Sequence, residues 1–419
     1  MSHPLLEIPA AFHRGEPKGI TSVCSAHPIV IEAALRLAGE LDRPALIEAT
    51  CNQVNQDGGY TGMTPADFRR FVEEIAVKSG YDPSRIILGG DHLGPNPWKN
   101  LPADDAMAKA ETMIAAFAKA GFTKLHLDTS MGCRGEPVAL ADEQTAERAA
   151  QLAAVAEATT GGDLLPVYIV GTEVPVPGGA VEELDHLQIT TPEAVAKTHE
   201  VHRSAFAALG LQDAFSRVIG LVVQPGVEFG HTDVIHFEPD KARALSECLK
   251  KYPGVVFEAH STDYQTESGL SALVQDGFAI LKVGPWLTFA LREALYGLDG
   301  VADVIEGHPP RGNLMATMEE IMQGSPDNWK KYYTGSSNDL WLQRHFSYSD
   351  RIRYYWPSDA AKSAVQVLMT RLHGKRIPDP ILNQFLPGIS ADKTGNDVNE
   401  ILLAAVQSIL VKYEDAVGS

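Results

Sequence analysis

Two short acidic and imidazole clusters are the parts of this sequence best suited to chemistry. Asp91 and His92 follow a pair of glycines, and a single alanine separates Glu258 from His260. Each cluster stands at the end of a short, largely apolar run that has the character of a buried strand. Carboxylates and imidazoles exchange protons near neutral pH and bind divalent cations. The pattern therefore indicates acid–base or metal chemistry at strand ends.

Runs of this kind recur along the chain and predict eight buried strands. They cover residues 19–23, 45–47, 85–88, 124–127, 167–170, 218–223, 255–257 and 279–283. Apolar residues at helical spacing lie between them, as in 30–41 and 106–117. Thr64 and Thr191 each precede a proline, which is typical of a helix start. Strand and helix thus alternate eight times, which predicts a parallel (β/α)8 barrel, or TIM barrel.

An open, doubly wound sheet is the structural alternative, but it usually carries a glycine-rich phosphate turn after its first strand. Here the first strand is followed by Cys24-Ser25-Ala26-His27 instead. In a barrel, the carboxyl ends of all strands meet on one face, so their polar residues become neighbours. A metal site there needs about three nitrogen or oxygen ligands. His92, His260 and one group after the sixth strand can supply them, with Asp91 as a base beside the metal.

Longer motifs at these strand ends resemble those of zinc-dependent class II fructose/tagatose-bisphosphate aldolases. Two of them are Lys124-Leu-His-Leu-Asp128-Thr-Ser130 and Gly171-Thr-Glu173-Val-Pro-Val-Pro-Gly178-Gly179. More closely, Glu48-Ala-Thr-Cys-Asn-Gln-Val-Asn-Gln and Gly89-Gly-Asp-His-Leu-Gly-Pro-Asn-Pro-Trp resemble the Z-type subunit family of D-tagatose-1,6-bisphosphate aldolase. The resemblance runs from about residue 19 into the C-terminal region, and the chain is identified as a member of that family.

The resemblance implies metal-dependent retro-aldol chemistry on a ketose or ketose phosphate. It implies Asp91 as the proton-transferring acid/base, Glu173 as a further acid/base group, and His92 and His260 as metal ligands. The implied metal is zinc, with manganese or magnesium as alternatives. We expect the substrate to be bound by polar residues at the other strand ends and in the C-terminal region, namely Ser25, Glu48, Asn52, Asp128, Glu258, Lys282 and Arg351.

The sequence departs from the aldolase pattern at two places. In the aldolases the ligand after the sixth strand is a histidine followed by glycine, whereas this chain has Gln224-Pro-Gly-Val-Glu228-Phe-Gly-His231. We expect Glu228 to be the ligand, with Gln224 and His231 as alternatives. The phosphate cradle expected after the seventh strand is replaced by a segment containing Asp263, which would repel a phosphate if it faced the site.

The leading functional expectation is a tagatose-type bisphosphate aldolase, or a subunit of one, in carbohydrate breakdown. One alternative is a non-catalytic partner that stabilises a catalytic class II aldolase subunit. Another is a 4-epimerase of a ketose or hexuronate, which breaks and re-forms the same C3–C4 bond. The family is also labelled tagatose-6-phosphate kinase. That role is less favoured, because the sequence has no G-x-x-x-x-G-K-[ST] phosphate loop.

The chain is longer than a barrel requires. It has 419 residues, and a TIM barrel normally takes roughly 250. We expect the barrel in residues 1–305 and a mainly helical extension, packed on it, in 306–419. The extension contains an aromatic and basic segment in which Arg351 and Arg353 could reach over the barrel mouth as oxyanion clamps.

The composition excludes several classes of partner. A net charge of −19 argues against nucleic acid and anionic membrane surfaces, which bind basic proteins. No apolar stretch approaches the roughly 20 residues of a membrane span, and no secretory leader is evident at the N-terminus. The four cysteines have no paired spacing. We therefore expect a cytoplasmic protein with reduced thiols, acting on a small sugar substrate as a homo- or hetero-oligomer.

Overall fold

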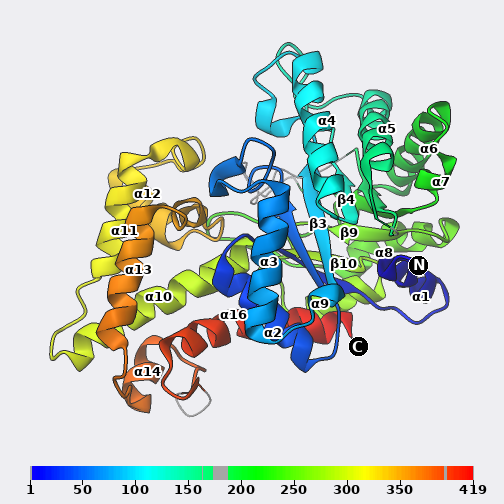
Figure 1. The fold of residues 1–419 in the computed structure, drawn as a ribbon. Helices are drawn as coiled ribbons and strands as arrows, with labels where there is room; N and C mark the ends of the chain where they lie inside the picture. The colour runs from blue at the N-terminus through cyan, green and yellow to red at the C-terminus, as the bar shows by residue number, and fades with distance from the viewer. Residues whose placement is uncertain (1, 163, 173–186, 391–393, 419) are drawn as a thin grey trace.

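The computed structural model describes residues 2–162, 164–172, 187–390 and 394–418. Its centre is a closed barrel of parallel strands in the order β1-β10-β9-β6-β5-β4-β3-β2 (Figure 1). The barrel strands are β1 (Ile20–Cys24), β2 (Ala45–Thr50), β3 (Ile86–Leu93), β4 (Lys124–Leu127), β5 (Val167–Val170), β6 (Val218–Val223), β9 (Val256–Ala259) and β10 (Ile280–Val283). All eight predicted runs overlap one of them, so the (β/α)8 barrel is confirmed. β3 extends furthest beyond its predicted end.

A layer of helices surrounds the barrel. It contains α2 (Pro28–Glu40), α3 (Pro65–Ser79), α4 (Ala103–Lys119), α5 (Asp142–Thr159), α6 (Pro192–Ala208), α8 (Pro239–Cys248) and α9 (Glu267–Gln275), with the short α7 (Gln212–Phe215) before β6. The predicted helix starts are confirmed. Thr64 caps α3 by accepting a hydrogen bond from the backbone N–H of Asp67 at 3.3 Å. No helix among the described residues is long and apolar enough to cross a bilayer.

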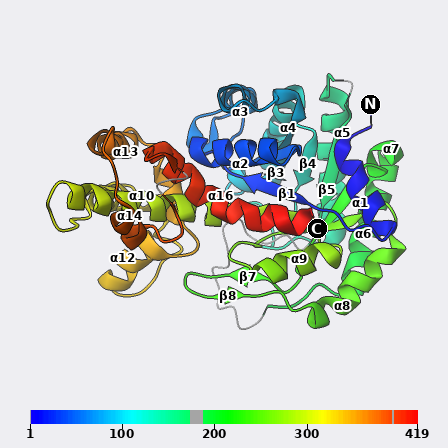
Figure 2. The same ribbon diagram turned by 90° about the horizontal axis from the view of Figure 1, so that it is seen from below.

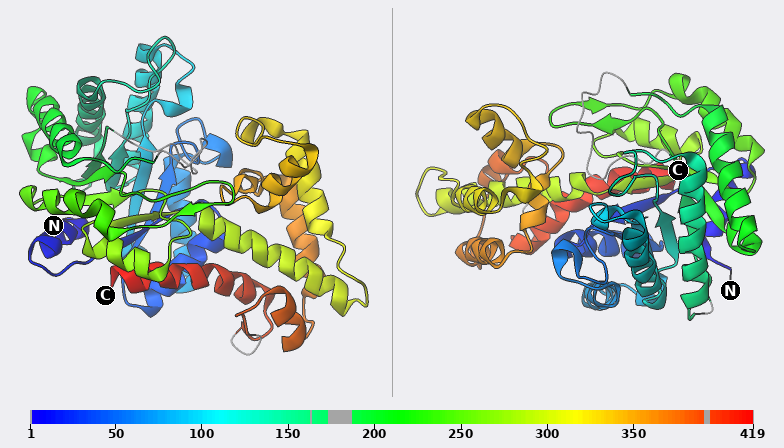
Figure 3. Two further views of the ribbon diagram at one scale, coloured as in Figure 1. Left: turned by 180° about the vertical axis from the view of Figure 1, so that it is seen from behind. Right: turned by 90° about the horizontal axis from the view of Figure 1, so that it is seen from above.

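The chain leaves the barrel along α10 (Pro285–Ile305), which runs outward rather than folding back (Figure 1). Four further helices gather at its far end, as Figure 3 shows from two sides. They are α11 (Asn313–Gly324), α12 (Ser337–Phe346), α13 (Asp359–Leu372) and α14 (Asp379–Phe385). The short 3₁₀ helix η8 (Arg351–Tyr355) lies between α12 and α13. The expected helical C-terminal extension is therefore confirmed.

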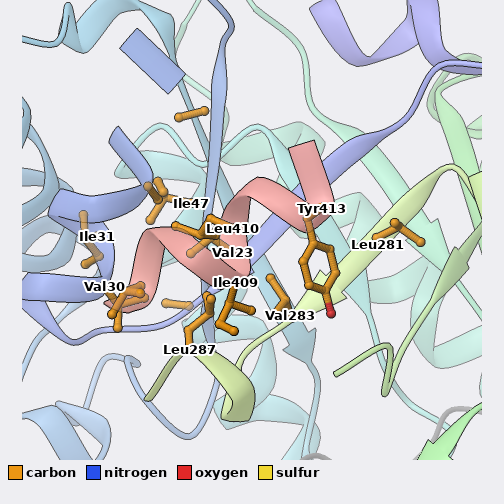
Figure 4. Packing of buried hydrophobic residues seen from close by; sticks show 14 of the residues in the cluster. Val23, Val30, Ile31, Ile47, Leu281, Val283, Leu287, Ile409, Leu410 and Tyr413 are labelled. Carbon is orange, nitrogen blue, oxygen red and sulfur yellow. The ribbon is translucent and has the colours of Figure 1, made fainter. Parts of the chain in front are cut away.

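The last helix, α16 (Val398–Val417), returns to the barrel and packs against α2, α9 and α10 (Figure 2). Ile409 and Leu410 of α16 lie against Val23 and Val283 at the barrel wall (Figure 4). The backbone N–H of Gly19 donates to the carbonyl of Val417 at 3.1 Å. The predicted boundary between barrel and extension near residue 305 stays a prediction. The helix α16, which lies in the predicted extension, packs on the barrel as an outer helix.

The barrel interior changes character along its axis. At the amino-terminal end, buried apolar side chains fill it, including Ile20, Leu46 and Ile280. Leu5 and Ile8, from η1 (Pro4–Leu6) and α1 (Glu7–His13), belong to the same cluster and plug this end. Toward the carboxyl ends of the strands the interior becomes charged, which is where active sites of this fold lie.

Candidate active site

Four buried side chains of metal-ligand type meet at the carboxyl ends of β3, β4 and β9. They are Asp91, His92, His126 and His260, and one potential ligand atom from each lies within 4.8 Å of the others. The pairing of β3 with β4 shifts register between Gly90 and Leu93, and His92 has a φ of 49°. A left-handed backbone is rare outside glycine and is often found at functional sites. The irregularity places His92 beside the other two histidines.

His92 is held by a carboxylate on the neighbouring strand end. Its Nδ1 lies 2.8 Å from Oδ2 of Asp128. Burial would raise the pKa of Asp128, but the hydrogen bond and charge of His92 lower it to about 2. The hydroxyl and backbone N–H of Ser130 donate to the other Asp128 oxygen. Asp128 therefore fixes the ring from behind and leaves Nε2 of His92 directed toward Asp91, whose Oδ2 is 3.8 Å away.

The other two histidines are held in the same manner. Nε2 of His260 lies 2.9 Å from Glu258, and burial lowers the pKa of His260 to about 4, so that the ring is neutral. Nδ1 of His126 lies 2.9 Å from Oδ1 of Asp91. Nε2 of His126 is buried without a hydrogen-bond partner. A histidine with one nitrogen fixed by a carboxylate and the other open is the usual arrangement of a metal ligand.

A chain of buried ion pairs lies beneath the histidines. Nζ of Lys124 is 2.6 Å from Glu48 and 2.6 Å from Glu258, and all three side chains are fully buried. Nζ of Lys282 contacts the other oxygen of Glu48 and lies 2.9 Å from Oδ1 of Asp91. Gly89 makes room for this chain, since a Cβ there would be 2.6 Å from Cγ of Glu48.

Among the described residues, the charges of this buried group do not balance without a further cation. Four carboxylates face two ammonium groups. Burial would lower the pKa of His92, but Asp91 and Asp128 raise it, so His92 adds one positive charge at most. Buried unbalanced charge is costly, and a divalent cation would neutralise two negative charges. The unpartnered nitrogen of His126 and the neutral ring of His260 suit such an ion. The residues present therefore fit a divalent metal of the kind that accepts imidazole and carboxylate ligands, while its identity is not shown.

The cluster opens into a pocket that encloses about 1090 Å³, the solvent at its mouth included. Asp91, His92, His260 and Lys282 line its deep side. The helical extension lines it as well, through residues of η8 and the turn after it, namely Arg353, Tyr354, Trp356 and Pro357. A pocket of this size accommodates a small organic ligand such as a sugar phosphate.

The structure gathers most of the predicted site residues but divides them between two layers. Ser25, Asn52 and Lys282 line the pocket together with the cluster. Glu48, Asp128 and Glu258 are not among the pocket-lining residues and contact Lys124, His92 and His260 instead, so their expected contact with substrate stays a prediction. Glu173 falls outside the described residues.

The candidates after β6 lie outside the histidine cluster. An oxygen of Glu228 accepts from the N–H of Phe229, and burial raises the Glu228 pKa to about 7. Gln224 accepts from two backbone N–H groups of its own turn. Both ring nitrogens of His231 are engaged, by Ser347 and by the carbonyl of Tyr332. Within the described residues, the group that could hold a metal contains His126 and not Glu228, and the ligand role of Glu228 stays a prediction.

Arg351 also lies elsewhere than expected. Its guanidinium stacks 3.4 Å from the ring centroid of Tyr332 and donates to the carbonyl of Asn328, away from the pocket. Arg353, two residues later, lines the pocket.

His126 and Lys124 were not among the residues expected at the site, although the sequence held a signal that places them there. Lys124 and His126 occupy alternate positions of β4 and therefore point to the same side of it, and Asp128 follows the strand at the same spacing. Polar residues repeating with this period in an otherwise buried strand indicate a polar barrel interior.

Comparison with known proteins identifies the family. Residues 5–418 match the model described as D-tagatose-1,6-bisphosphate aldolase subunit GatZ/KbaZ-like. A protein named D-tagatose 6-phosphate 4-epimerase, from Agrobacterium fabrum, is 53% identical over 421 residues, covering 100% of this chain and 99% of that protein. A crystal structure titled probable tagatose 6 phosphate kinase, from Sinorhizobium meliloti 1021, is 57% identical with a TM-score of 0.88, over 95% of this chain and 100% of the other.

A more distant solved structure, the fructuronate-tagaturonate epimerase UxaE of Cohnella laeviribosi, has a TM-score of 0.50 at 14% identity, over 96% of this chain and 82% of the other. At that identity the likeness concerns the fold alone. The family match over nearly the whole chain agrees with the resemblance in the strand-end motifs. The chain therefore belongs to the D-tagatose-1,6-bisphosphate aldolase subunit GatZ/KbaZ-like family.

Proposed function

We propose that this protein is a metal-dependent 4-epimerase of a ketohexose phosphate, with tagatose 6-phosphate as the first substrate to test. The observation that carries the proposal is the buried set of three histidines around Asp91, of which His92, His260 and Asp91 line the pocket. The relative named as an epimerase, 53% identical along the whole chain, supports the choice among the reactions that such a set allows.

The reaction needs a base, a cation near the carbonyl and a closed pocket. Removal of the proton from the C4 hydroxyl breaks the C3–C4 bond, and the bonding electrons pass to the C2 carbonyl to give an enediolate and an aldehyde. Addition of the enediolate to the opposite face of the aldehyde re-forms the bond with C4 inverted. A divalent cation at His92, His126 and His260 would supply positive charge for the carbonyl oxygen.

Asp91 is the residue best placed to move the proton. Its Oδ1 is occupied by His126 and Lys282, whereas Oδ2 has, among the described residues, Cys24 at 3.5 Å and His92 at 3.8 Å. Burial would raise the pKa of Asp91, but the charges of His92 and Lys282 hold it well below its usual range. Asp91 is therefore an ionised acceptor with one oxygen turned to the pocket.

The contribution of the extension to the pocket is compatible with epimerisation. Arg353, Tyr354 and Trp356 of the extension line the pocket together with residues of the barrel. An epimerase has to retain both halves of the cleaved sugar until the aldehyde has turned, and additional lining residues give it more contacts with them. An aldolase uses the same bond cleavage but releases the halves.

A second role is favoured by the family description, which refers to a subunit of an aldolase. In that role the chain would support a separate catalytic subunit in a hetero-oligomer, and its own pocket would be dispensable. Both roles belong to sugar-phosphate metabolism and to the cytoplasm, where phosphorylated sugars are retained.

The test is incubation of the purified chain alone with tagatose 6-phosphate, with manganese, zinc or magnesium and with a chelated control. We expect metal-dependent formation of fructose 6-phosphate, the C4 epimer, without accumulation of trioses. Asp91→Asn should abolish the reaction, and the exposed Asp104→Asn should leave it intact. Triose release in equal amounts would identify an aldolase instead. A metal-loaded chain that does neither would favour the partner role.

A further inference from the structure

The pocket contains a guanidinium that forms no ion pair with a described carboxylate, although from a greater distance its charge opposes the rise in pKa that burial causes at Asp263 and Asp350. Arg353 lines the pocket and makes no ion pair with any described residue. Two other buried guanidinium groups of the same region are paired, Arg292 with Asp350 and Arg344 with Glu319. Arg353 thus differs from its neighbours in having its charge available. A cation placed in a ligand pocket without a counterion is suited to an anionic ligand.

The hydrogen bonds of Arg353 leave one edge of the guanidinium open. Nη1 donates to the carbonyls of Ser349 and Asp350, the latter at 3.0 Å. Nη2 donates to the hydroxyl of Tyr354 at 3.0 Å. Among the described residues nothing accepts from Nε–H or from the second Nη2–H. A guanidinium with Nε–H and one Nη2–H free has two donors left for the oxygens of a phosphate.

The neighbouring residues hold this edge in place before a ligand arrives. Asp350, which precedes η8, accepts from Thr288 at 2.6 Å and from Arg292 at 3.3 Å, and so ties the segment to α10. The Tyr354 ring lies 4.5 Å from the Arg353 guanidinium. Tyr60, from the loop after β2, meets Tyr354 edge-on at 4.9 Å. The extension and the barrel therefore position Arg353 jointly, which reduces the entropy lost on binding.

The remaining charged groups of the pocket are committed elsewhere. Lys282 is the other lysine or arginine among the described lining residues, and it is paired with Glu48 and Asp91. Oδ1 of Asp263 accepts from the backbone N–H groups of Gly284 and Trp286, in the first turn of α10. Asp263 was expected from the sequence to repel a phosphate. Its Oδ1 is instead hydrogen-bonded to the start of α10. Arg353 is left as the cation for an anion in this pocket.

From this arrangement we infer that Arg353 binds the phosphate group of the substrate and makes it a determinant of specificity. The inference rests on the proposed ketohexose phosphate 4-epimerase function for its substrate class. In this view the helical extension supplies the phosphate site and the barrel supplies the reacting groups. Arg353 then binds the phosphate end of the sugar phosphate, and the residues of the barrel bind the end that carries the C2 carbonyl.

Calorimetric titration of the full chain with tagatose 6-phosphate, and separately with inorganic phosphate, tests the inference. Arg353→Met should weaken binding of both roughly 10- to 100-fold, as expected for the loss of hydrogen bonds to a charged group. Arg353→Lys keeps the charge but loses the planar guanidinium, so its affinity should lie between those of the parent and of Arg353→Met. Arg376→Met, an exposed arginine of the same extension, should bind as the parent does. Unaltered binding by Arg353→Met, with its thermal unfolding unchanged, would overturn the inference.

Kinetics separate the inference from the proposed function. For tagatose 6-phosphate, Arg353→Met should raise KM by a similar factor with a smaller change in kcat, and kcat/KM for unphosphorylated tagatose should stay the same. Equal losses for both sugars would show a structural role and overturn the inference. If the parent chain binds the phosphate ester through Arg353 but does not epimerise it, the proposed function fails while the phosphate site stands.

Discussion

Lys124 and Glu48 face each other across 2.6 Å in the barrel interior, and neither side chain is exposed to solvent. Burial would lower the pKa of Lys124, but Glu258 and Glu48 raise it above its usual value. The ammonium group thus stays charged inside the protein and joins two carboxylates that lead to opposite sides of the site. Glu258 contacts His260 on one side. On the other side Glu48 contacts Lys282, which in turn contacts Asp91.

Replacement of Lys124 by methionine should therefore destabilise the protein strongly. Glu48 and Glu258 would remain buried without their common cation, and breaking a buried ion pair on one side costs about 3–5 kcal/mol. Chemical denaturation should show this loss in the free energy of unfolding. Lys119→Met, at an exposed position of α4, should change it little. Equal stability of the two variants would mean that Lys124 is not required to balance the carboxylates.

Removal of a histidine from the cluster should remove metal binding. Because Nε2 of His126 is buried without a partner, we expect His126→Ala to weaken binding of zinc or manganese by roughly 100-fold or more, and Asp128→Asn by about 10- to 100-fold. Equilibrium dialysis followed by elemental analysis measures this, with the exposed His373→Ala as the control. Retention of metal by His126→Ala would exclude His126 as a ligand.

Stability should fall as the pH is lowered from 6.5 toward 4, in part because of His202. This residue is fully buried on α6 and its Nδ1 lies 2.8 Å from the carbonyl of Thr198. Burial lowers its pKa from 6.5 to about 4. Between these values the unfolded chain binds the proton and the folded chain does not, so acid favours unfolding, by about 3 kcal/mol at full effect. His202→Gln should flatten this part of the stability profile, and the exposed His373→Gln should not.

A chain that ends at residue 305 should not fold into a stable barrel. It lacks α16, whose apolar face covers α2, α9 and the wall formed by β1 and β10. Exposure of that face would produce aggregation or a loosely packed state, detectable by size-exclusion chromatography and by the absence of a cooperative thermal transition. A monomeric 1–305 fragment with a sharp transition would show that the barrel is an independent domain as the sequence suggests.

The barrel was predictable because its evidence is local. Each strand is a short apolar run, and each helix has its own period and start signal, as at Thr64. The return of α16 was not predictable in this way, since nothing in the last twenty or so residues reports contact with α2, more than 350 positions earlier. Long-range packing of this kind leaves the apolar pattern of a helix unchanged.

The site was predictable where chemistry and strand ends coincide, as at Asp91, His92 and His260. His126 was obscured because it lies within a strand instead of after one. Of the two arginines expected at the barrel mouth, Arg353 lines the pocket and Arg351 does not, and this difference has a geometric cause. In a 3₁₀ helix successive side chains are rotated by about 120°, so two residues at positions i and i+2 point in different directions. Sequence alone does not tell which of them faces the pocket.

The hydrogen bond from Gly19 to Val417 has a consequence for synthesis of the protein. The first strand of the barrel is covered by α16, which comes more than 370 residues later, so the barrel wall is complete only after α16 has been synthesised. A prematurely terminated product would keep an open apolar seam beside β1 and offer a ready target to cellular proteases. The order of the helices thereby ensures that a closed barrel also carries the segment containing Arg353.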